Sequence, residues 1–190
     1  MTRPAAVDYE VPSRSVPREH AVEDRSDALS ATLRIVTTVG IALWLGSLAH
    51  LLLTVGSLFA AFPKAISSVA VEAAPVIFRA SERAGLIVAA VTLAAAVSWN
   101  WRSAARSRRW IAWLLAVAAT LAVMQTTIVS ARMERLRADG LSSGDAFRTL
   151  HRASSSQYLV QTALLLTSCA LLPAALRDLP RSRYAGRGPG

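Results

Sequence analysis

The sequence predicts an all-α polytopic membrane protein with four transmembrane helices in an antiparallel bundle. The chain has 190 residues, room for about one domain, and is 53% hydrophobic and 17% charged. An average soluble domain has roughly 25% charged residues. Asp, Glu, Lys and Arg are absent from four long stretches: 35–63, 84–101, 110–131 and 153–176. Because about 20 apolar residues cross the hydrocarbon core as a helix, each stretch is taken as one membrane span.

Prolines, tryptophans and arginines mark the boundaries of the spans. Span 1 covers about 35–61 and ends before Pro63. Spans 2 (84–101) and 3 (110–131) are separated by the arginine-rich turn 102–109, which has tryptophans on both sides. Tryptophan and arginine gather at membrane interfaces, so these two spans are expected to form an antiparallel hairpin. Span 4 covers about 153–176.

The remaining segments are polar. Residues 1–34 contain three prolines and no apolar period, which predicts a disordered N-terminal tail with a short lead-in helix from about residue 21. Residues 65–83 are amphipathic, which predicts an interfacial helix or a long span 2, with Pro75 as a possible first helical residue. A polar loop is expected over 132–152 and a disordered C-terminal tail over 177–190.

The net charge of +9 is located in the segments between the spans. This distribution indicates membrane topology and argues against nucleic acid as a partner, so the lipid bilayer is the expected partner. With four spans, both termini and the turn 102–109 share one side, which carries 13 basic residues against 8 on the other. The positive-inside rule then predicts cytoplasmic termini in a cell membrane, and the preference for Arg over Lys suggests a bacterial inner membrane.

Polar residues inside the spans follow helical spacing and predict polar helix faces. Span 1 carries Ala42, Gly46, His50 and Thr54, span 3 carries Gln125, Thr126, Thr127 and Ser130, and span 4 carries Ser154, Gln157, Gln161 and Ser168. One interpretation is hydrogen bonding between helices, with Gly40, Gly46 and Gly56 allowing close packing. The other is a polar path for a substrate or ion.

Two histidines are candidate ligands. His50 is an ionisable residue deep in span 1, and His151 lies just before span 4. Together they could bind haem or copper, although the favoured interpretation of His50 is a neutral histidine that bonds to a Ser, Thr or Gln. The single Cys169 is expected to be a small packing residue. Phosphate-loop, zinc-protease and nucleophile-elbow motifs are absent from the sequence, so no catalytic residue is predicted.

Three segments carry motifs of a known family. They are Leu43-Trp44-Leu45-Gly46-Ser47 with Leu58-Phe59, then 73–79, then Phe147-Arg148-Thr149-Leu150-His151-Arg152-Ala153-Ser154. The chain thereby resembles the transmembrane protein 205-like family (DUF4149), over about 35–170. The resemblance implies four transmembrane helices and a shared role, such as capping the last helix, for His151 and Ser154. It implies no reaction, substrate or cofactor. Ser57 replaces an expected Pro, and His50 replaces an expected apolar residue.

The function expected from the sequence is that of a small, non-enzymatic structural or accessory membrane protein without a cofactor. Its expected partners are further copies of itself or other membrane proteins. A transporter or channel-like protein with a polar intramembrane path is the first alternative, and a haem- or copper-binding protein using His50 and His151 is the second. The two leading interpretations differ in whether the polar stripes meet at a wet cavity or at a dry seam.

Overall fold

The computed structural model describes residues 17–61, 67–102 and 105–177. These residues form the helices α1 (Pro17–Ala61), α2 (Ser67–Arg102), α3 (Arg106–Met124), α4 (Ala131–Ala138) and α5 (Asp145–Arg177). A π-helical turn, η2 (Gln125–Ser130), joins α3 to α4 without interrupting the rod. The described residues contain four helical segments long and apolar enough to cross a membrane: Arg25–Leu58, Ala73–Arg102, Arg106–Ala138 and Asp145–Arg177. The predicted all-α fold with four spans is confirmed.

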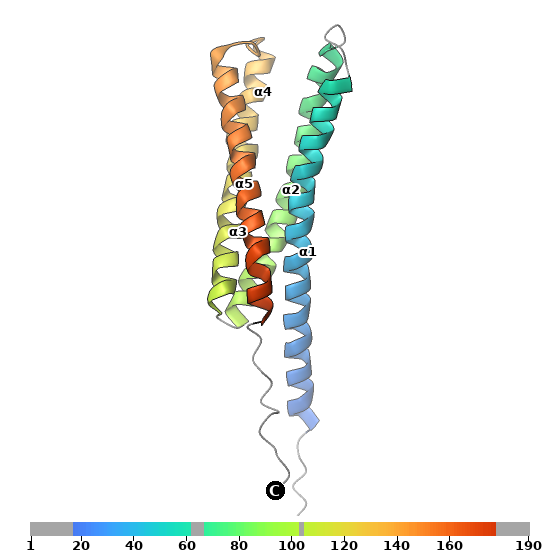
Figure 1. The fold of residues 1–190 in the computed structure, drawn as a ribbon, viewed down its shortest axis with the longest axis vertical. Coiled ribbons are helices and arrows are strands. Elements are labelled where there is room, and N and C mark those ends of the chain that lie inside the picture. The colour runs from blue at the N-terminus through green and yellow to red at the C-terminus, as the bar shows by residue number, and fades with distance from the viewer. Residues whose placement is uncertain (1–16, 62–66, 103–104, 178–190) are drawn as a thin grey trace, which may run out of the picture.

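The helices run alternately up and down (Figure 1). In that view, α1 rises, α2 descends beside it, the rod of α3, η2 and α4 rises, and α5 descends. The start of α1, the end of α2, the start of α3 and the end of α5 therefore lie toward one end of the bundle, called here the arginine end. The opposite end is called the loop end. Helix α1 packs mainly on α2, whereas α3 packs on both α2 and α5.

The core consists of large apolar side chains from α1, α3 and α5 set against small residues of α2. Trp44, Ile41, Leu115 and Leu165 are fully buried, and α2 contributes Ala89 and Ala96. Small residues on α2 let the neighbouring helices approach closely, which is the usual way helices associate in membranes. Large apolar residues elsewhere on the helices, such as Leu53 and Ile87, are exposed on the outside of the bundle, as expected for a lipid-facing surface.

Gly40 allows the closest approach between α1 and α2. A Cβ placed on Gly40 would lie 2.1 Å from Thr92 Oγ1, far inside van der Waals contact. Gly46 and Gly56 have no atom within 4 Å of such a Cβ. Of the three glycines expected to permit close packing, only Gly40 does so within this chain.

The helices extend well beyond the predicted spans. The prediction of a disordered tail over 1–34 is wrong from Pro17 onward, where α1 begins and passes into span 1 without a break. The lead-in helix expected from about residue 21 is part of α1. Proline suits the first turn of a helix, because its fixed φ is helical and its missing N–H would have no partner there. Residues 1–16 and 178–190 lie outside the described part of the chain.

Two other predicted boundaries need correction. Pro75 lies inside α2 and does not start a helix, so span 2 is the long helix that the amphipathic segment allowed. The predicted polar loop 132–152 is mostly helical, because α4 reaches Ala138 and α5 begins at Asp145. Polar side chains do not end a helix that has left the bilayer, since its backbone hydrogen bonds are internal. The chain reverses between α4 and α5 at Gly140, which has a φ of 72°.

Candidate functional site

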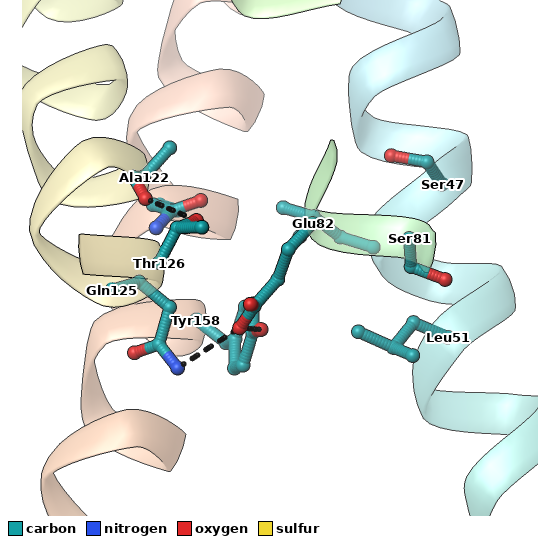
Figure 2. Close-up of a pocket in the computed structure, with 10 residues that line it drawn as sticks. Ser47, Leu51, Ser81, Glu82, Ala122, Gln125, Thr126 and Tyr158 are labelled. Carbon is teal, nitrogen blue, oxygen red and sulfur yellow. Dashed lines mark hydrogen bonds between the residues drawn. The ribbon is translucent and has the colours of Figure 1, made fainter. Parts of the chain in front are cut away.

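A buried carboxylate is the centre of the largest polar cluster in the described bundle. Glu82 of α2 is 9% exposed. Its Oε1 atom accepts hydrogen bonds from Ser130 Oγ at 2.6 Å, Tyr158 OH at 3.0 Å and Gln125 Nε2 at 3.3 Å. Gln125 Nε2 also lies 2.8 Å from Ser154 Oγ. Figure 2 shows Glu82 reaching from α2 toward Gln125 and Tyr158. We call these five residues the Glu82 cluster.

On α2 and α5, the residues of the Glu82 cluster lie on the buried face of the helix, as their seven-residue spacing from other buried residues shows. On α2, Glu82 lies seven residues before the core residue Ala89, so it occupies the same inward face. On α5, Ser154 and Gln161 are likewise seven apart and both buried. Tyr158 lies between them on the same face, and its ring contacts Phe78 of α2 at a centroid distance of 6.3 Å. Core packing therefore sets the positions of these polar groups.

The π-helical turn brings the third helix into the cluster. In a regular α-helix, residues five apart point in directions about 140° apart. The wider π turn places them closer to one face, and Gln125 Nε2 lies 3.2 Å from Ser130 Oγ. Both side chains can therefore reach the same Glu82 oxygen. Single π turns of this kind occur frequently at functional sites.

A small, partly open pocket adjoins the carboxylate. It has a volume of about 30 Å³, more than the roughly 10–15 Å³ that one water molecule needs. Glu82, Gln125, Tyr158 and Gln161 are among its lining residues, together with Ser47 from α1. Gln161 is only 1% exposed, and its Nε2 atom has no hydrogen-bond partner in the described structure. Gln125 Oε1 is likewise without a partner, so the pocket borders two amides whose hydrogen-bonding capacity is partly unused.

The position of the Glu82 cluster along the membrane normal follows from helix rise. Glu82 lies 20 residues before Arg102, the last residue of α2, which corresponds to roughly 30 Å. The hydrocarbon core is also about 30 Å thick. With Trp101 and Arg102 at the interface of the arginine end, the carboxylate is placed near the far boundary of the hydrocarbon core, toward the loop end.

Further buried polar residues lie between the Glu82 cluster and the arginine end. Ser168 continues the heptad line of α5, seven residues after Gln161, and Thr92 and Thr37 are buried on α2 and α1. Their hydroxyls donate to carbonyls of their own helices, at 2.9, 2.6 and 2.8 Å respectively. Such bonds satisfy the hydroxyl proton and leave the oxygen able to accept. Polar oxygens therefore recur along the interior of the bundle.

A buried arginine terminates this line at the arginine end. Arg108 is 2% exposed. Its Nε donates to the carbonyl of Ala175 at 3.3 Å, and its guanidinium lies 4.8 Å from the centre of the Trp99 ring. Ala175 is seven residues after Ser168, so the heptad line of α5 runs from Ser154 to the Arg108 contact. The guanidinium is held by a cation–π contact and by the free carbonyl of a helix C-terminus.

The predicted stripes have different outcomes. The structure places Ser154, Gln161 and Ser168 on the buried face of α5, with Gln157 half-buried. In span 3, Gln125 and Ser130 join the Glu82 cluster, whereas the hydroxyls of Thr126 and Thr127 donate to carbonyls of their own helix. The span 1 stripe points away from the bundle, because Ala42, Gly46 and His50 are exposed. The inward face of α1 carries Trp44, which is two residues from Ala42 and from Gly46 and so lies on the opposite side of the helix.

The two candidate histidines lie in different surroundings. His50 is exposed on α1, and its Nε2 lies 3.4 Å from Thr54 Oγ1 on the same helix. His151 is exposed on α5, and its carbonyl accepts a hydrogen bond from Ser155. No contact between the two rings is seen in the described structure, and its described residues contain no group of three His, Cys, Asp or Glu side chains placed to hold a metal ion. Cys169 is half-buried.

The family-motif residues are spread over the bundle. Trp44 is a core residue at 1% exposure, and Gly46 is on the outer surface of α1. Phe59 lies in α1, but its side chain is outside the described part. Phe147 is covered by the guanidinium of Arg137 at 5.1 Å. His151 and Ser154 cannot cap the last helix, because α5 begins at Asp145, six residues before His151. Ser154 serves the Glu82 cluster.

Sequence reasoning missed Glu82, the central residue of the site. The predicted span 2 begins after the last charge, at residue 84, and therefore leaves Glu82 in the preceding amphipathic segment. The heptad phase was the available signal. Counting back in sevens from Ala96 and Ala89, which are small residues suited to helix packing, leads to Glu82.

The comparisons with known proteins add no relative. No family model, curated protein or solved structure matches this chain. The resemblance to the transmembrane protein 205-like family stays a prediction from the three motifs. The architecture and the Glu82 cluster establish a four-helix bundle of the multi-pass membrane type, with a buried carboxylate among hydroxyl and amide groups.

Proposed function

We propose that this chain is a transport-type membrane protein in which Glu82 binds and releases a proton. The observation that carries the proposal is the buried carboxylate itself. An ionisable residue that faces the interior of a membrane bundle is costly, and such residues commonly serve ion pathways and proton relays. Here the carboxylate is held by three donors and adjoins a pocket large enough for a water molecule.

The surroundings of Glu82 support both protonation states. The three donors stabilise the ionised form, since a buried carboxylate needs hydrogen bonds to offset the loss of hydration. When Glu82 is protonated, its hydroxyl can donate to a neighbouring oxygen, and the hydroxyls of Ser130 and Tyr158 can rotate to accept. The unpaired Gln125 Oε1 and Gln161 Nε2 atoms supply an acceptor and a donor for a water molecule that delivers the proton.

The buried hydroxyls on the arginine side are the further polar groups that a path through the bundle would use. Ser168, Thr92 and Thr37 present oxygens in the bundle interior between the Glu82 cluster and Arg108. By the positive-inside rule, the arginine end faces the cytoplasm of a bacterial cell membrane. Glu82 then receives protons from the outer side, and the Arg108 contact is the barrier at the inner side.

The test is proton flux into liposomes that contain the purified full chain and a trapped pH indicator. A pH gradient is imposed and the rate of acidification is compared among variants. We expect Glu82→Gln to reduce the rate to that of protein-free liposomes, because the amide cannot carry a proton at this site. Glu82→Asp keeps the carboxyl group and should retain measurable flux.

The matched control is Glu134→Gln. Glu134 of α4 also lies toward the loop end of the bundle, but its side chain is 40% exposed. It forms an ion pair with Arg79 of α2 at 3.2 Å. The same chemical change there should leave flux unchanged. Equal flux in wild type and in Glu82→Gln, with both proteins folded by circular dichroism, would contradict the proposal.

A second candidate is the structural or accessory role expected from the sequence, in which α1 contacts a second copy of the chain. The outward position of the span 1 stripe favours it, because Gly46 and His50 face away from the bundle inside a membrane-spanning helix. A polar side chain in that position gains from a hydrogen-bonding neighbour, and glycine permits close approach.

Cysteine crosslinking in membranes tests this second candidate. In a Cys169→Ala background, Gly46→Cys should form disulfide-linked dimers on mild oxidation. Leu159→Cys on α5 is the control, because that position is 67% exposed on a different helix. Crosslinking at neither position, or equally at both, would argue against an interface on α1.

A further inference from the structure

One outer face of α3 carries an ordered series of side chains at the arginine end. Arg106, Arg109, Trp110, Trp113, Leu114 and Val117 line a surface hollow of about 510 Å³. Their spacing of three, one, three, one and three residues places them on a single stripe of the helix. Both arginines are exposed, Trp110 is 54% exposed and Trp113 is 62% exposed, so no other described helix covers this face.

The order of chemical types along the stripe matches the order of groups in a phospholipid. Two guanidinium groups come first, two amphipathic indoles follow, and two aliphatic side chains complete the series toward the membrane centre. From Arg106 to Val117 the helix rises roughly 16 Å. That distance spans a lipid from its headgroup through the glycerol region into the upper part of its acyl chains, about half of the hydrocarbon thickness.

The charge of the stripe selects among lipids. Neither Arg106 nor Arg109 forms an ion pair with a described acidic side chain. Guanidinium groups bind phosphate oxygens with paired hydrogen bonds. Exposed Arg102 adds a third positive charge at the same end of the bundle. A lipid with net negative charge is therefore favoured over a zwitterionic one.

We propose that the α3 stripe is a binding site for an anionic phospholipid, with Arg106 and Arg109 on the headgroup phosphate and Trp113, Leu114 and Val117 along the acyl chains. The site is independent of Glu82, since the two sets of residues share no member and lie toward opposite ends of the bundle. It orders a lipid beside the α2–α3 turn, the most arginine-rich segment of the chain.

Native mass spectrometry of the full chain in mild detergent tests the proposal. The protein is titrated with phosphatidylglycerol or with phosphatidylcholine of the same acyl composition, and the dissociation constant of the first bound lipid is measured. We expect tighter binding of phosphatidylglycerol. The double variant Arg106→Gln and Arg109→Gln should weaken it roughly 25-fold, about five-fold for each charge. Lysine at both positions keeps the charge and should retain most of the affinity.

The control is the double variant Arg132→Gln and Arg135→Gln, which removes two exposed arginines at the loop end. It should leave the dissociation constant of phosphatidylglycerol within about two-fold of wild type. Equal binding of the two lipids by the wild type would overturn the proposal. So would an equal loss in both glutamine double variants, because general charge attraction would then account for the effect. The proton-flux assay for Glu82 and this lipid-binding measurement are independent, so failure of one proposal does not imply failure of the other.

Discussion

At the residue scale, burial and hydrogen bonding separate the polar residues that matter to the bundle from those that do not. His50 and Glu82 are both ionisable and both belong to membrane-spanning helices. His50 is exposed on the outer surface, whereas Glu82 accepts three hydrogen bonds from two other helical segments. The sequence made His50 conspicuous because it stands alone in a charge-free stretch. Glu82 was missed because Arg83 follows it, and the charge-free stretch that defines span 2 begins only after Arg83.

The Gly40 contact gives a prediction at this scale. We expect Gly40→Ala to destabilise the protein by about 1–3 kcal/mol, because the new methyl group would overlap Thr92 and force α1 and α2 apart. Gly46→Ala is the matched control, since its methyl group would meet no atom. Thermal unfolding in detergent, followed by circular dichroism, measures both. Equal melting temperatures for the two variants would show that the Gly40 contact carries no such restriction.

At the element scale, helix ends depend on more than hydropathy. The charge-free stretches located four spans correctly, but α1, α4 and α5 continue for several turns into polar sequence. Hydropathy reports where lipid begins, whereas a helix ends where its backbone hydrogen bonds end. The helix before Gly140, for example, ends at Ala138, seven residues after the predicted end of span 3. The π turn at 125–130 is likewise not predicted by the sequence. It accompanies hydrogen bonds from both Gln125 and Ser130 to Glu82 on another helix.

The contact of Arg108 is a prediction at the element scale, because this side chain on α3 joins Trp99 of α2 to the end of α5. We expect Arg108→Lys to lower the stability of the bundle by about 1–3 kcal/mol. Lysine has no planar group to stack on Trp99 and no Nε donor at the same position for the Ala175 carbonyl.

Arg102→Lys is the control for Arg108→Lys, because Arg102 is exposed at the same end of the bundle. Chemical unfolding in mixed micelles compares the two variants with wild type. If both lysine variants unfold at the same denaturant concentration as the wild type, the buried contact contributes no measurable stability. If only Arg108→Lys unfolds earlier, the contact ties the three helices together as described.

At the scale of the whole molecule, the alternation of the four spans places the start of α1 and the end of α5 on one side of the membrane. The arginine distribution predicts that this side is the cytoplasm. In a Cys169→Ala background, Ser142→Cys between α4 and α5 should react with a membrane-impermeant maleimide added to intact cells. Arg102→Cys at the end of α2 should react only after the cells are permeabilised. Both positions are exposed in the structure, and the reverse labelling pattern would show an inverted topology.

The sequence by itself determined the fold class, the number of spans and their antiparallel order. These properties follow from local composition, because a run of about 20 apolar residues must cross the hydrocarbon core as a helix with its backbone bonds satisfied internally. Because each span carries the chain across the membrane, successive spans must alternate in direction. The polar heptad line on α5 could also be identified from spacing alone, from Ser154 to Ser168.

Only the tertiary structure decided which helix faces meet. Helix α1 carries two plausible inward stripes, and packing chose the one with Trp44 and Gly40 over the one with Gly46 and His50. Glu82, Gln125, Ser130, Ser154 and Tyr158 come from positions far apart in the chain, and their convergence depends on the rotation of three helical segments about their axes. That rotation is set by side-chain packing across the bundle, which no local property of the sequence specifies.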